Sequence, residues 1–185
     1  MKRIVALSLA VIALSASCVK KLEDLVEVKF SVPYSKQVNV QGLPGNPPIP
    51  PAGLTTSIPA IAVETKSEEY IKEYNTSSEL ISEAKLSELK LEINAPASQT
   101  FDMVDSLWLF VSATGLPEVQ AAYYFDIPKG LQVINMVTSQ ENLKDYFLRD
   151  SMYFRLQGHF YDAPDSATVF TINTKFDAVA KPLKK

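Results

Sequence analysis

The sequence is poor in the residues from which most catalytic and metal sites are built. It contains one cysteine (Cys18), one histidine (His159) and one tryptophan (Trp108) among its 185 residues. One histidine and one cysteine cannot supply the three or four nitrogen and sulfur ligands of a zinc site. No serine lies in a G-x-S-x-G pattern, and the glycines of residues 42–53 stand among prolines. The sequence therefore offers neither a nucleophile elbow nor a phosphate-binding loop, and we expect no catalytic residue, metal or dissociable cofactor.

The sequence also lacks a block of basic residues. Its 18 lysines and arginines are outnumbered by 21 aspartates and glutamates, which gives a net charge of −3. Binding to nucleic acid depends on lysine and arginine contacts to phosphate groups, so this balance argues against a nucleic-acid partner. No internal repeat is visible.

The N-terminus has the layout of a bacterial secretory signal. Lys2 and Arg3 precede an uncharged apolar run over residues 4–14, and the small residues Ser-Ala-Ser follow at 15–17. This order of basic, apolar and small residues is typical of a signal peptide. A membrane-spanning helix needs about 20 apolar residues, so the run is too short for a permanent anchor. We interpret residues 1–17 as a cleaved signal peptide.

Cys18 stands directly after the small residues, and the segment Leu-Ser-Ala-Ser-Cys resembles the lipobox of bacterial lipoproteins. The large aliphatic residue, Leu14, lies four positions before the cysteine, whereas the usual pattern has it three before. The resemblance implies cleavage before Cys18 and a covalent diacylglycerol, with acyl chains such as palmitate, on its thiol. It also implies a membrane as partner, with residues 18–24 as a lipidated tether. The alternative is a secreted protein with one free thiol.

The resemblance implies a location as well. Lys20 rather than aspartate follows Val19, so the inner-membrane retention signal of the family is not evident and the outer membrane is favoured. Whether the protein lies on its periplasmic face or at the surface is left open. Cleavage would leave 168 residues, and removal of Lys2 and Arg3 lowers the basic count from 18 to 16 and the net charge to −5. A chain of this length is expected to form one domain, residues 25–185, with an ordinary hydrophobic core.

Apolar and polar residues alternate over many short stretches after the tether. Residues 26–32, 89–93 and 107–111 each place apolar side chains at every second position. The two clearest stretches close the chain, at 152–161 and 170–178, and the short polar loop between them predicts an antiparallel hairpin. The predicted fold class is mainly β, a single antiparallel β-sandwich that is immunoglobulin-like or transthyretin-like.

One to three short helices are expected beside the strands. Acidic residues behind Ser67 and Ser78 predict helices over 68–74 and 78–84, with the two serines as N-caps.

A Pro-rich loop is expected at residues 42–59. This stretch holds six of the twelve prolines, which excludes a regular ladder of N–H donors. Two interpretations remain open, a recognition segment or a rigid loop over one end of the domain.

The clearest candidate for function is an aromatic face. On the predicted strand over 152–161, Tyr153, Arg155, His159 and Tyr161 share the polar side, and Trp108 lies opposite the aliphatic side of another strand. Aromatic rings with an arginine are common on surfaces that bind protein or glycan. The alternative for Trp108 is a position beneath the helices of 67–85. The alternatives for His159 are a general base or metal ligand, or a histidine that only packs on the sheet.

Two pairs of carboxylates are the remaining candidates for chemistry. Asp102 with Asp105 and Asp162 with Asp165 each fall at a strand end or turn. A Ca²⁺ ion needs six to eight oxygen ligands, and neither pair has the repeated spacing of a calcium loop. Local hydrogen bonds in turns are the other explanation for these residues.

The sequence thus predicts a lipid-anchored, non-catalytic protein of the cell envelope that acts as a binding or assembly module. Its partner would be an envelope protein or a glycan. One alternative is a structural or adhesion subunit of a surface assembly that exchanges strands, which requires an unpaired sheet edge. A further alternative is an envelope hydrolase, which requires His159 beside a carboxylate and a serine.

Overall fold

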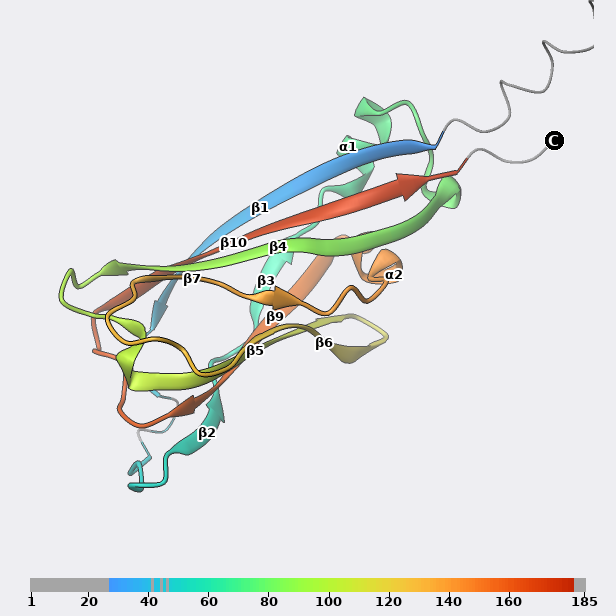
Figure 1. Cartoon of the computed structure of the whole chain (residues 1–185). Coiled ribbons are helices and arrows are strands. Elements are labelled where there is room, and N and C mark those ends of the chain that lie inside the picture. Colours follow the sequence, from blue (N-terminus) through green and yellow to red (C-terminus); the bar gives the residue numbers. More distant parts are fainter. Residues whose placement is uncertain (1–26, 41, 44, 46, 182–185) are drawn as a thin grey trace, which may run out of the picture.

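Two antiparallel β-sheets lie face to face in the computed structural model, which describes residues 27–40, 42, 43, 45 and 47–181 (Figure 1). The predicted signal peptide 1–17, Cys18 and the tether 18–24 lie outside the described residues. The mainly β sandwich that the alternation predicts is confirmed.

The first sheet has four strands in the order β1-β10-β4-β7. These strands span Val28–Val40, Thr168–Ala180, Ile81–Ala95 and Val133–Asn135. The second sheet has six strands, and its main path runs β2-β9-β5-β6-β8. They span Leu54–Ser57, Ser151–Phe160, Val104–Ala113, Leu116–Tyr124 and Val137–Thr138. The sixth strand, β3 (Ile61–Glu64), also pairs with β9.

Alternation along the strands builds the core. Every second residue of β10 is buried, and the residues between them are half-exposed. β5 and β9 repeat this pattern in the six-stranded sheet. The inward side chains of the two sheets meet, and large ones such as Phe154, Phe176 and Leu109 are fully buried. Burial of one such side chain contributes about 1.5–3 kcal/mol, so the facing strands are the main source of stability.

The last two long strands do not form the predicted hairpin. β9 pairs with β2, β3 and β5, whereas β10 pairs with β1 and β4. The turn at 161–167 carries the chain from one sheet to the other, and Asp162 and Asp165 accept backbone N–H bonds there. β9 and β10 each have one apolar side. These two apolar sides are both buried when the strands face each other across the core. Periodicity alone does not distinguish this arrangement from pairing in one sheet.

The first expected helix is confirmed as α1 (Ser67–Glu73), but the second is wrong. Only the 3₁₀ turn η1 (Ser78–Leu80) forms there, and β4 begins at Ile81. Ile81 and Ala84 are fully buried, and this burial outweighs the weak helix preference of the segment. The predicted N-caps are also wrong, because Lys66 and Ser77 occupy those positions without a side-chain cap bond.

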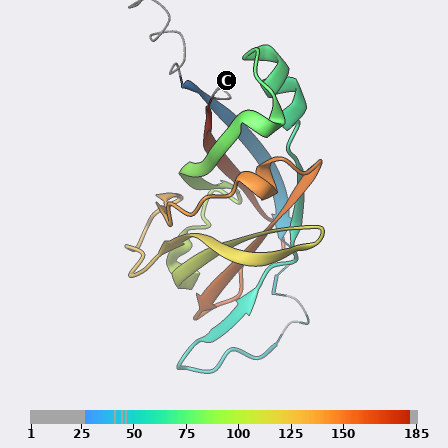
Figure 2. The same cartoon turned by 90° about the vertical axis from the view of Figure 1, so that its right-hand side faces the viewer.

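The helical segments lie at the ends and side of the sandwich. α1 packs where β1 begins and β10 ends, and Tyr74 beyond it stacks on Phe30 with ring centroids 4.7 Å apart (Figures 1 and 2). α2 (Lys144–Phe147) contacts strands of both sheets and buries Phe147 completely. A 3₁₀ turn, η2 (Phe101–Met103), leads into β5.

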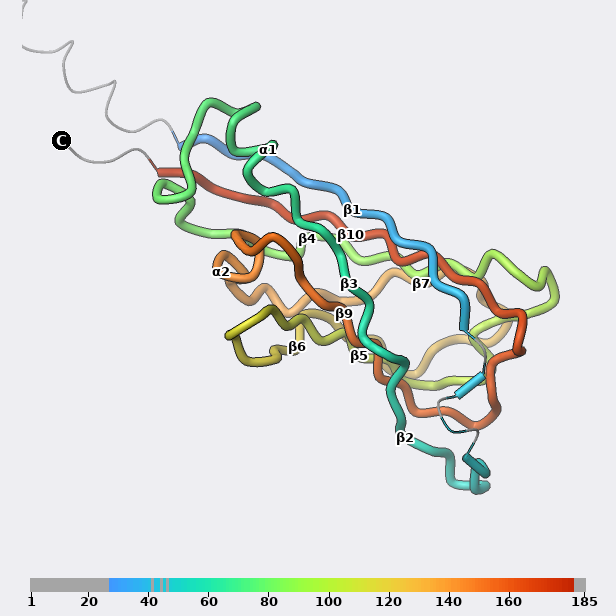
Figure 3. The backbone as a smooth tube through the Cα atoms, turned by 180° about the vertical axis from the view of Figure 1, so that it is seen from behind, coloured from blue at the N-terminus to red at the C-terminus, as the bar shows by residue number. Residues whose placement is uncertain are grey.

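The Pro-rich loop is partly a strand. Residues 54–57 form β2 against β9, and Leu43 and Ile58 are buried, so this segment contributes to the core. Figure 3 shows β2 and the chain before it at the end of the sandwich far from α1. Pro33 does not end the first strand, since β1 continues through it to Val40.

Candidate binding face

The outward side of the six-stranded sheet carries the residues that the sequence singled out. Trp108 and Phe110 of β5 alternate with buried residues and therefore point away from the core. The alternating residues of β9 that point the same way are Tyr153, Arg155, Gln157 and His159. None of the described helices lies over this side of β5, β6 and β9 (Figures 1 and 2).

Strand register aligns the outward residues into a row. Trp108 lies opposite Tyr123 of β6 and Gln157 of β9. Tyr123 in turn lies opposite Val137 of β8, and Gln157 lies opposite Ser57 of β2. Directly opposed residues have Cβ atoms about 4.5–5.5 Å apart, so neighbours in this row are in contact range. We call these five residues the cross-strand row.

Ring contacts hold the aromatic end of the cross-strand row. The Trp108 and Phe125 rings meet edge to face with centroids 5.7 Å apart, and the Tyr123 and Phe125 centroids are 5.1 Å apart. Such pairs contribute about 0.5–1.5 kcal/mol beyond the area they bury. Phe125 is nevertheless 50% exposed and Val137 52% exposed, so this end of the row is open to solvent.

A β-bulge in β6 brings Tyr123 and Phe125 to this face. The register of β6 against β5 shifts by one residue at Ala121, and Ala121 and Ala122 are both fully buried. A bulge inserts one extra residue and reverses the phase of alternation beyond it. Gln120 before the bulge and Tyr123 after it therefore both point outward.

Arg155 is fixed in place by three partners. Its Nε and Nη2 donate to the two carboxylate oxygens of Glu118 at 2.8 and 2.5 Å, and Nη1 donates to the Ser57 hydroxyl at 2.6 Å. Its guanidinium carbon lies 4.3 Å from the centroid of the Phe110 ring. The hydrogen bonds to Arg155 lower the pKa of the Glu118 carboxyl, and those to Glu118 raise the pKa of the guanidinium. The pair is therefore charged, oriented and mutually neutralised.

His159 is held by the end of the Pro-rich loop. Its Nε2 lies 3.1 Å from the carbonyl oxygen of Ala52, and its Nδ1 lies 2.9 Å from the Thr55 hydroxyl. A carbonyl oxygen only accepts, so Nε2 carries a proton, and in the neutral ring Nδ1 accepts from Thr55. The ring edge meets Tyr161 with centroids 5.1 Å apart. A hydrolase would require the His159 ring to bond a carboxylate and a serine. Among the described residues, neither ring nitrogen bonds either group.

The residues predicted as a binding face lie on one side of the sheet or at its end, but in separate groups. Arg155 packs on Phe110, two residues along β5 from Trp108. His159 and Tyr161 form a second group beside β2. Tyr153 lies towards the other end of β9, opposite Ser112 of β5 and Ala62 of β3, and is 36% exposed.

The covered position considered for Trp108 is wrong. The helices expected over 67–85 reduce to α1 and a short 3₁₀ turn, and α1 packs near the start of β1 instead. The rest of that segment is β4, in the opposite sheet.

The sequence alone does not place Tyr123, Phe125 and Glu118 on this face. Residues 121–127 are aromatic-rich, which is a signal for a surface or core cluster, but the bulge breaks their alternation. The ion pair of Glu118 with Arg155 joins residues 37 positions apart, and no local pattern predicts it.

Three of the four paired carboxylates serve turns, whereas Oδ1 of Asp105 is buried without a hydrogen-bond partner among the described residues. An Oδ1 of Asp102 accepts the Gly130 N–H at 2.6 Å, and Asp162 and Asp165 each bond a backbone N–H close by in sequence. In the described part of the chain, no three His, Cys, Asp or Glu side chains converge as metal ligands. No helix among the described residues is long and apolar enough to cross a membrane.

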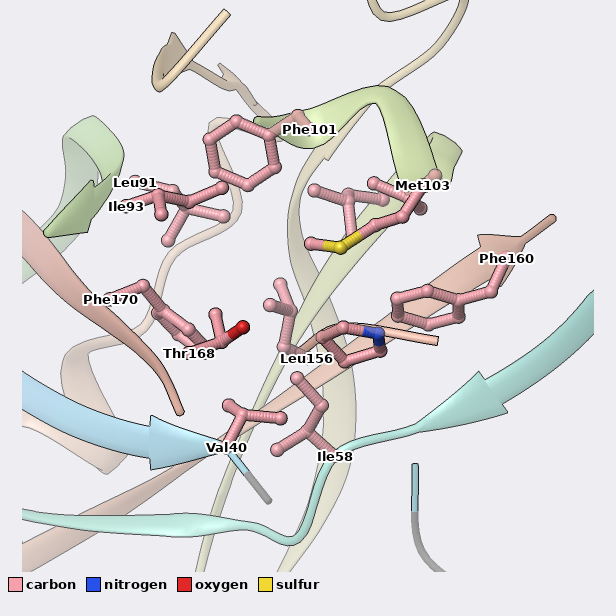
Figure 4. Close-up of a pocket in the computed structure, with 13 residues that line it drawn as sticks. Val40, Ile58, Leu91, Ile93, Phe101, Met103, Leu156, Phe160, Thr168 and Phe170 are labelled. Carbon is pink, nitrogen blue, oxygen red and sulfur yellow. The ribbon is translucent and has the colours of Figure 1, made fainter. Parts of the chain in front are cut away.

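A small cavity lies between the sheets (Figure 4). Its volume of ≈ 20 Å³ is about that of one water molecule, and its lining is apolar. The Thr168 hydroxyl lies in this lining without a hydrogen-bond partner in the described residues. One hydroxyl cannot hold a water by itself, so we regard the cavity as imperfect packing rather than a ligand site.

Comparison with known proteins leaves the function open. No protein-family pattern and no curated protein matches the chain. A solved structure from desmodium yellow mottle tymovirus is 14% identical, covers 85% of this chain and 91% of its own, and gives a TM-score of 0.27. One from turnip yellow mosaic virus is 13% identical, covers 100% and 93%, and also gives 0.27. Likenesses this low carry no argument about ancestry or activity.

Proposed function

We propose that the protein is a lipid-anchored, non-catalytic binding module of the bacterial cell envelope. The observation that carries the proposal is the outward face of the six-stranded sheet. There the exposed Phe125 ring contacts Trp108 and Tyr123, and Arg155, held by three partners, packs on Phe110 of the same strand as Trp108. Aromatic residues and arginine are enriched in interfaces, and exposed apolar patches on soluble domains commonly mark interaction sites. The membrane attachment rests on the lipobox-like segment that ends in Cys18.

The positions of the chain ends are compatible with an anchor at one end of the sandwich. Val28 at the start of β1 lies opposite Ala180 at the end of β10, and Glu27 pairs with Lys181 at 3.8 Å. The ten residues 18–27, which are the predicted tether 18–24 and the three residues after it, span at most about 33–36 Å when fully extended. A tether of that reach would allow the outward face to clear the lipid headgroups.

The attachment is tested on the protein purified from membranes. Mass spectrometry of the N-terminal peptide should find cleavage before Cys18 and a diacylglycerol on its thiol. A Cys18→Ala variant should move from the membrane fraction to the soluble fraction while its circular dichroism spectrum stays the same. An unmodified cysteine, or cleavage at another position, would remove the basis for the anchor and for the outer-membrane location.

The binding role is tested by footprinting in intact cells. Hydroxyl radicals should modify Trp108, Tyr123 and Phe125 less in the envelope than in the purified chain, because a bound partner covers them. Tyr74, an exposed ring beyond α1, is the matched control and should react equally in both. Equal modification of the outward face in cells and in solution would contradict a partner at this face.

A structural subunit of a surface assembly is the second candidate. β1 is an edge strand of 13 residues whose second side is unpaired in the described structure, as strand exchange requires. Two features of β1 oppose that use. Pro33 has no N–H to donate, and Lys36 places a charge on the side of the strand that Tyr34 and Val38 turn towards the core. Tyr34 and Val38 are partly buried against the core, and Lys36 between them is exposed. A proline and an inward-pointing charge are both common protections of an edge against pairing. A concentration-independent monomer in sedimentation would rule this candidate out.

A further inference from the structure

We infer that the outward face of the six-stranded sheet binds a neutral glycan chain along the cross-strand row. This inference rests on the proposed function and adds the chemical class of the partner.

The row, together with Phe125 beside Trp108 and Tyr123, offers apolar rings and uncharged hydrogen-bonding groups side by side on an open sheet. Trp108, Tyr123 and Phe125 supply ring surface at one end, and Gln157 and Ser57 supply an amide and a hydroxyl at the other. Gln120, which is exposed, adds a second amide on the next outward position of β6. A sugar ring has the same mixed character, because its C–H faces are apolar and hydroxyl groups surround its rim. Each sugar unit could thus place a face on a ring and a hydroxyl on an amide.

Charge favours a neutral ligand. Among the outward residues of β5 and β9 from Ser106 to Phe110 and from Arg155 to His159, the one formally charged side chain is Arg155. Its charge is balanced by the bidentate bond with Glu118 of β6. A phosphate-bearing or strongly acidic polymer would meet no free cation here, and breaking the Arg155 pair would cost both of its hydrogen bonds.

A protein partner fits the face less well. Protein interfaces are anchored by side chains that fill well-packed, fully desolvated pockets, and their buried centre is more apolar than the rest of the surface. The outward positions of β5 and β9 hold no Leu, Ile, Val or Met, and Val137 on the edge strand β8 is the aliphatic member of the row. The rings of Trp108 and Tyr123 stand on neighbouring strands of a pleated sheet, which suits a flat repeating chain.

The chain carries its own probe for this test, because Trp108 is its sole tryptophan and lies in the row. The full-length lipidated protein, kept in a detergent without a sugar headgroup, is titrated with laminarin, galactomannan and xyloglucan. We expect a saturable shift in tryptophan emission with at least one of these neutral polysaccharides. Polygalacturonate, an acidic polymer, should bind at least tenfold more weakly.

Variants locate the binding. Phe125→Ala and Gln157→Ala should each weaken binding at least tenfold, while Tyr74→Ala should leave the apparent Kd unchanged. Circular dichroism checks that each variant is folded.

The inference is overturned if none of the three neutral polysaccharides changes the emission, or if Phe125→Ala and Gln157→Ala bind as well as Tyr74→Ala. If Trp108 is protected in intact cells but no polysaccharide binds, the inference of a glycan ligand is overturned while the proposed binding function still stands. If the protein neither binds a polysaccharide nor shows protection of Trp108 in cells, the proposed function is contradicted as well.

Discussion

At Gly53 the absence of a side chain lets the Pro-rich loop approach β9. Its φ of +83° is left-handed, and an added Cβ would lie 2.3 Å from Nε2 of His159. We predict that Gly53→Ala lowers the free energy of unfolding by more than the roughly 1–2 kcal/mol that left-handed backbone alone costs a side chain. The excess arises because the ring must move and lose its bonds to Ala52 and Thr55. Urea unfolding measures the loss.

Gly115→Ala is the matched control for this prediction. Gly115 has a similar φ of +78°, but an added Cβ there would meet nothing within 4 Å. The difference between the two variants isolates the contact with His159. Equal losses would show that the loop does not depend on this close approach.

The ion pair of Glu118 with Arg155 predicts a dependence of stability on pH. Hydrogen bonds from Arg155 lower the pKa of the Glu118 carboxyl in the folded state below its unfolded value of about 4.3. The stability from this pair is therefore present above pH 4.3 and lost as the pH falls through the lowered pKa. At pH 7, Glu118→Gln should lower the free energy of unfolding by less than about 1 kcal/mol, because the side chains of Glu118 and Arg155 both reach solvent. Below the lowered pKa, where Glu118 is protonated, the substitution should not change the free energy of unfolding.

Urea unfolding of wild type and Glu118→Gln between pH 7 and pH 3 checks this prediction. The two curves should converge as the pH falls. Glu68→Gln is the control, since its pair with Lys72 at 3.6 Å is exposed on both sides. A constant gap between wild type and Glu118→Gln at all pH values would contradict a role for ionised Glu118.

The short helix α2 fills space at the side of the sandwich with a buried aromatic side chain. It is only four residues long, yet Phe147 is fully buried and its ring centroid lies 6.5 Å from that of Phe176. We predict that Phe147→Ala costs about 3–5 kcal/mol, because it removes a large side chain and leaves a cavity between the sheets. Leu148→Ala, at a less buried position, should cost less. Similar losses from both variants would mean that α2 packs loosely.

The edge strand β1 supports a prediction about association. Replacing Pro33 and Lys36 with valine restores one backbone N–H and removes a charge from the free edge. We predict that Pro33→Val with Lys36→Val causes self-association at micromolar concentration, measured by sedimentation velocity. Lys90→Val is the control, because Lys90 lies on β4 with pairing strands on both sides. A monomeric double variant would show that other features protect the edge.

Alternation in the sequence predicted the inward residues of β5, β9 and β10, because burial of one face imposes a period of two on every such strand. It could not predict which strands pair. Residues 152–161 and 170–178 read as a hairpin, yet they lie in opposite sheets, since an apolar side is satisfied equally by either arrangement. The sequence predicts a helix over 78–84 because Ser78 and the acidic residues behind it are typical of a helix start, but the same polar residues are compatible with the strand that forms from Ile81.

The candidate site was predictable only where it follows the alternation. Trp108, Arg155 and His159 were correctly placed on the outward side because their strands are regular. Tyr123 and Phe125 were missed because the bulge at Ala121 reverses the phase of β6, and a bulge depends on tertiary packing. The separation of Tyr153 from Tyr161 follows from the length of β9, which spreads a shared face over most of the sheet.

For the molecule as a whole, the antiparallel pairing of the first and last strands sets the direction from which any tether approaches. Val28 lies opposite Ala180, whereas Ala95, at the far end of β4, lies opposite Val169. The end with α1 and the end with the Pro-rich loop are therefore opposite poles of the sandwich (Figure 3). The cross-strand row runs across the strands between these poles, on the face of one sheet.

This geometry predicts that the sandwich tolerates circular permutation. A short linker can join Lys181 to Glu27, which already form an ion pair, and new ends can be placed between the exposed residues Ala97 and Ser98. The cut lies next to the hydrogen bond from Gln132 to the Ala97 carbonyl, so we expect a loss of about 1–2 kcal/mol with cooperative unfolding retained. Circular dichroism melting measures it. A permutant that fails to fold would show that the link from β4 to η2 must be intact, whereas a folded one would carry a tether at the opposite pole.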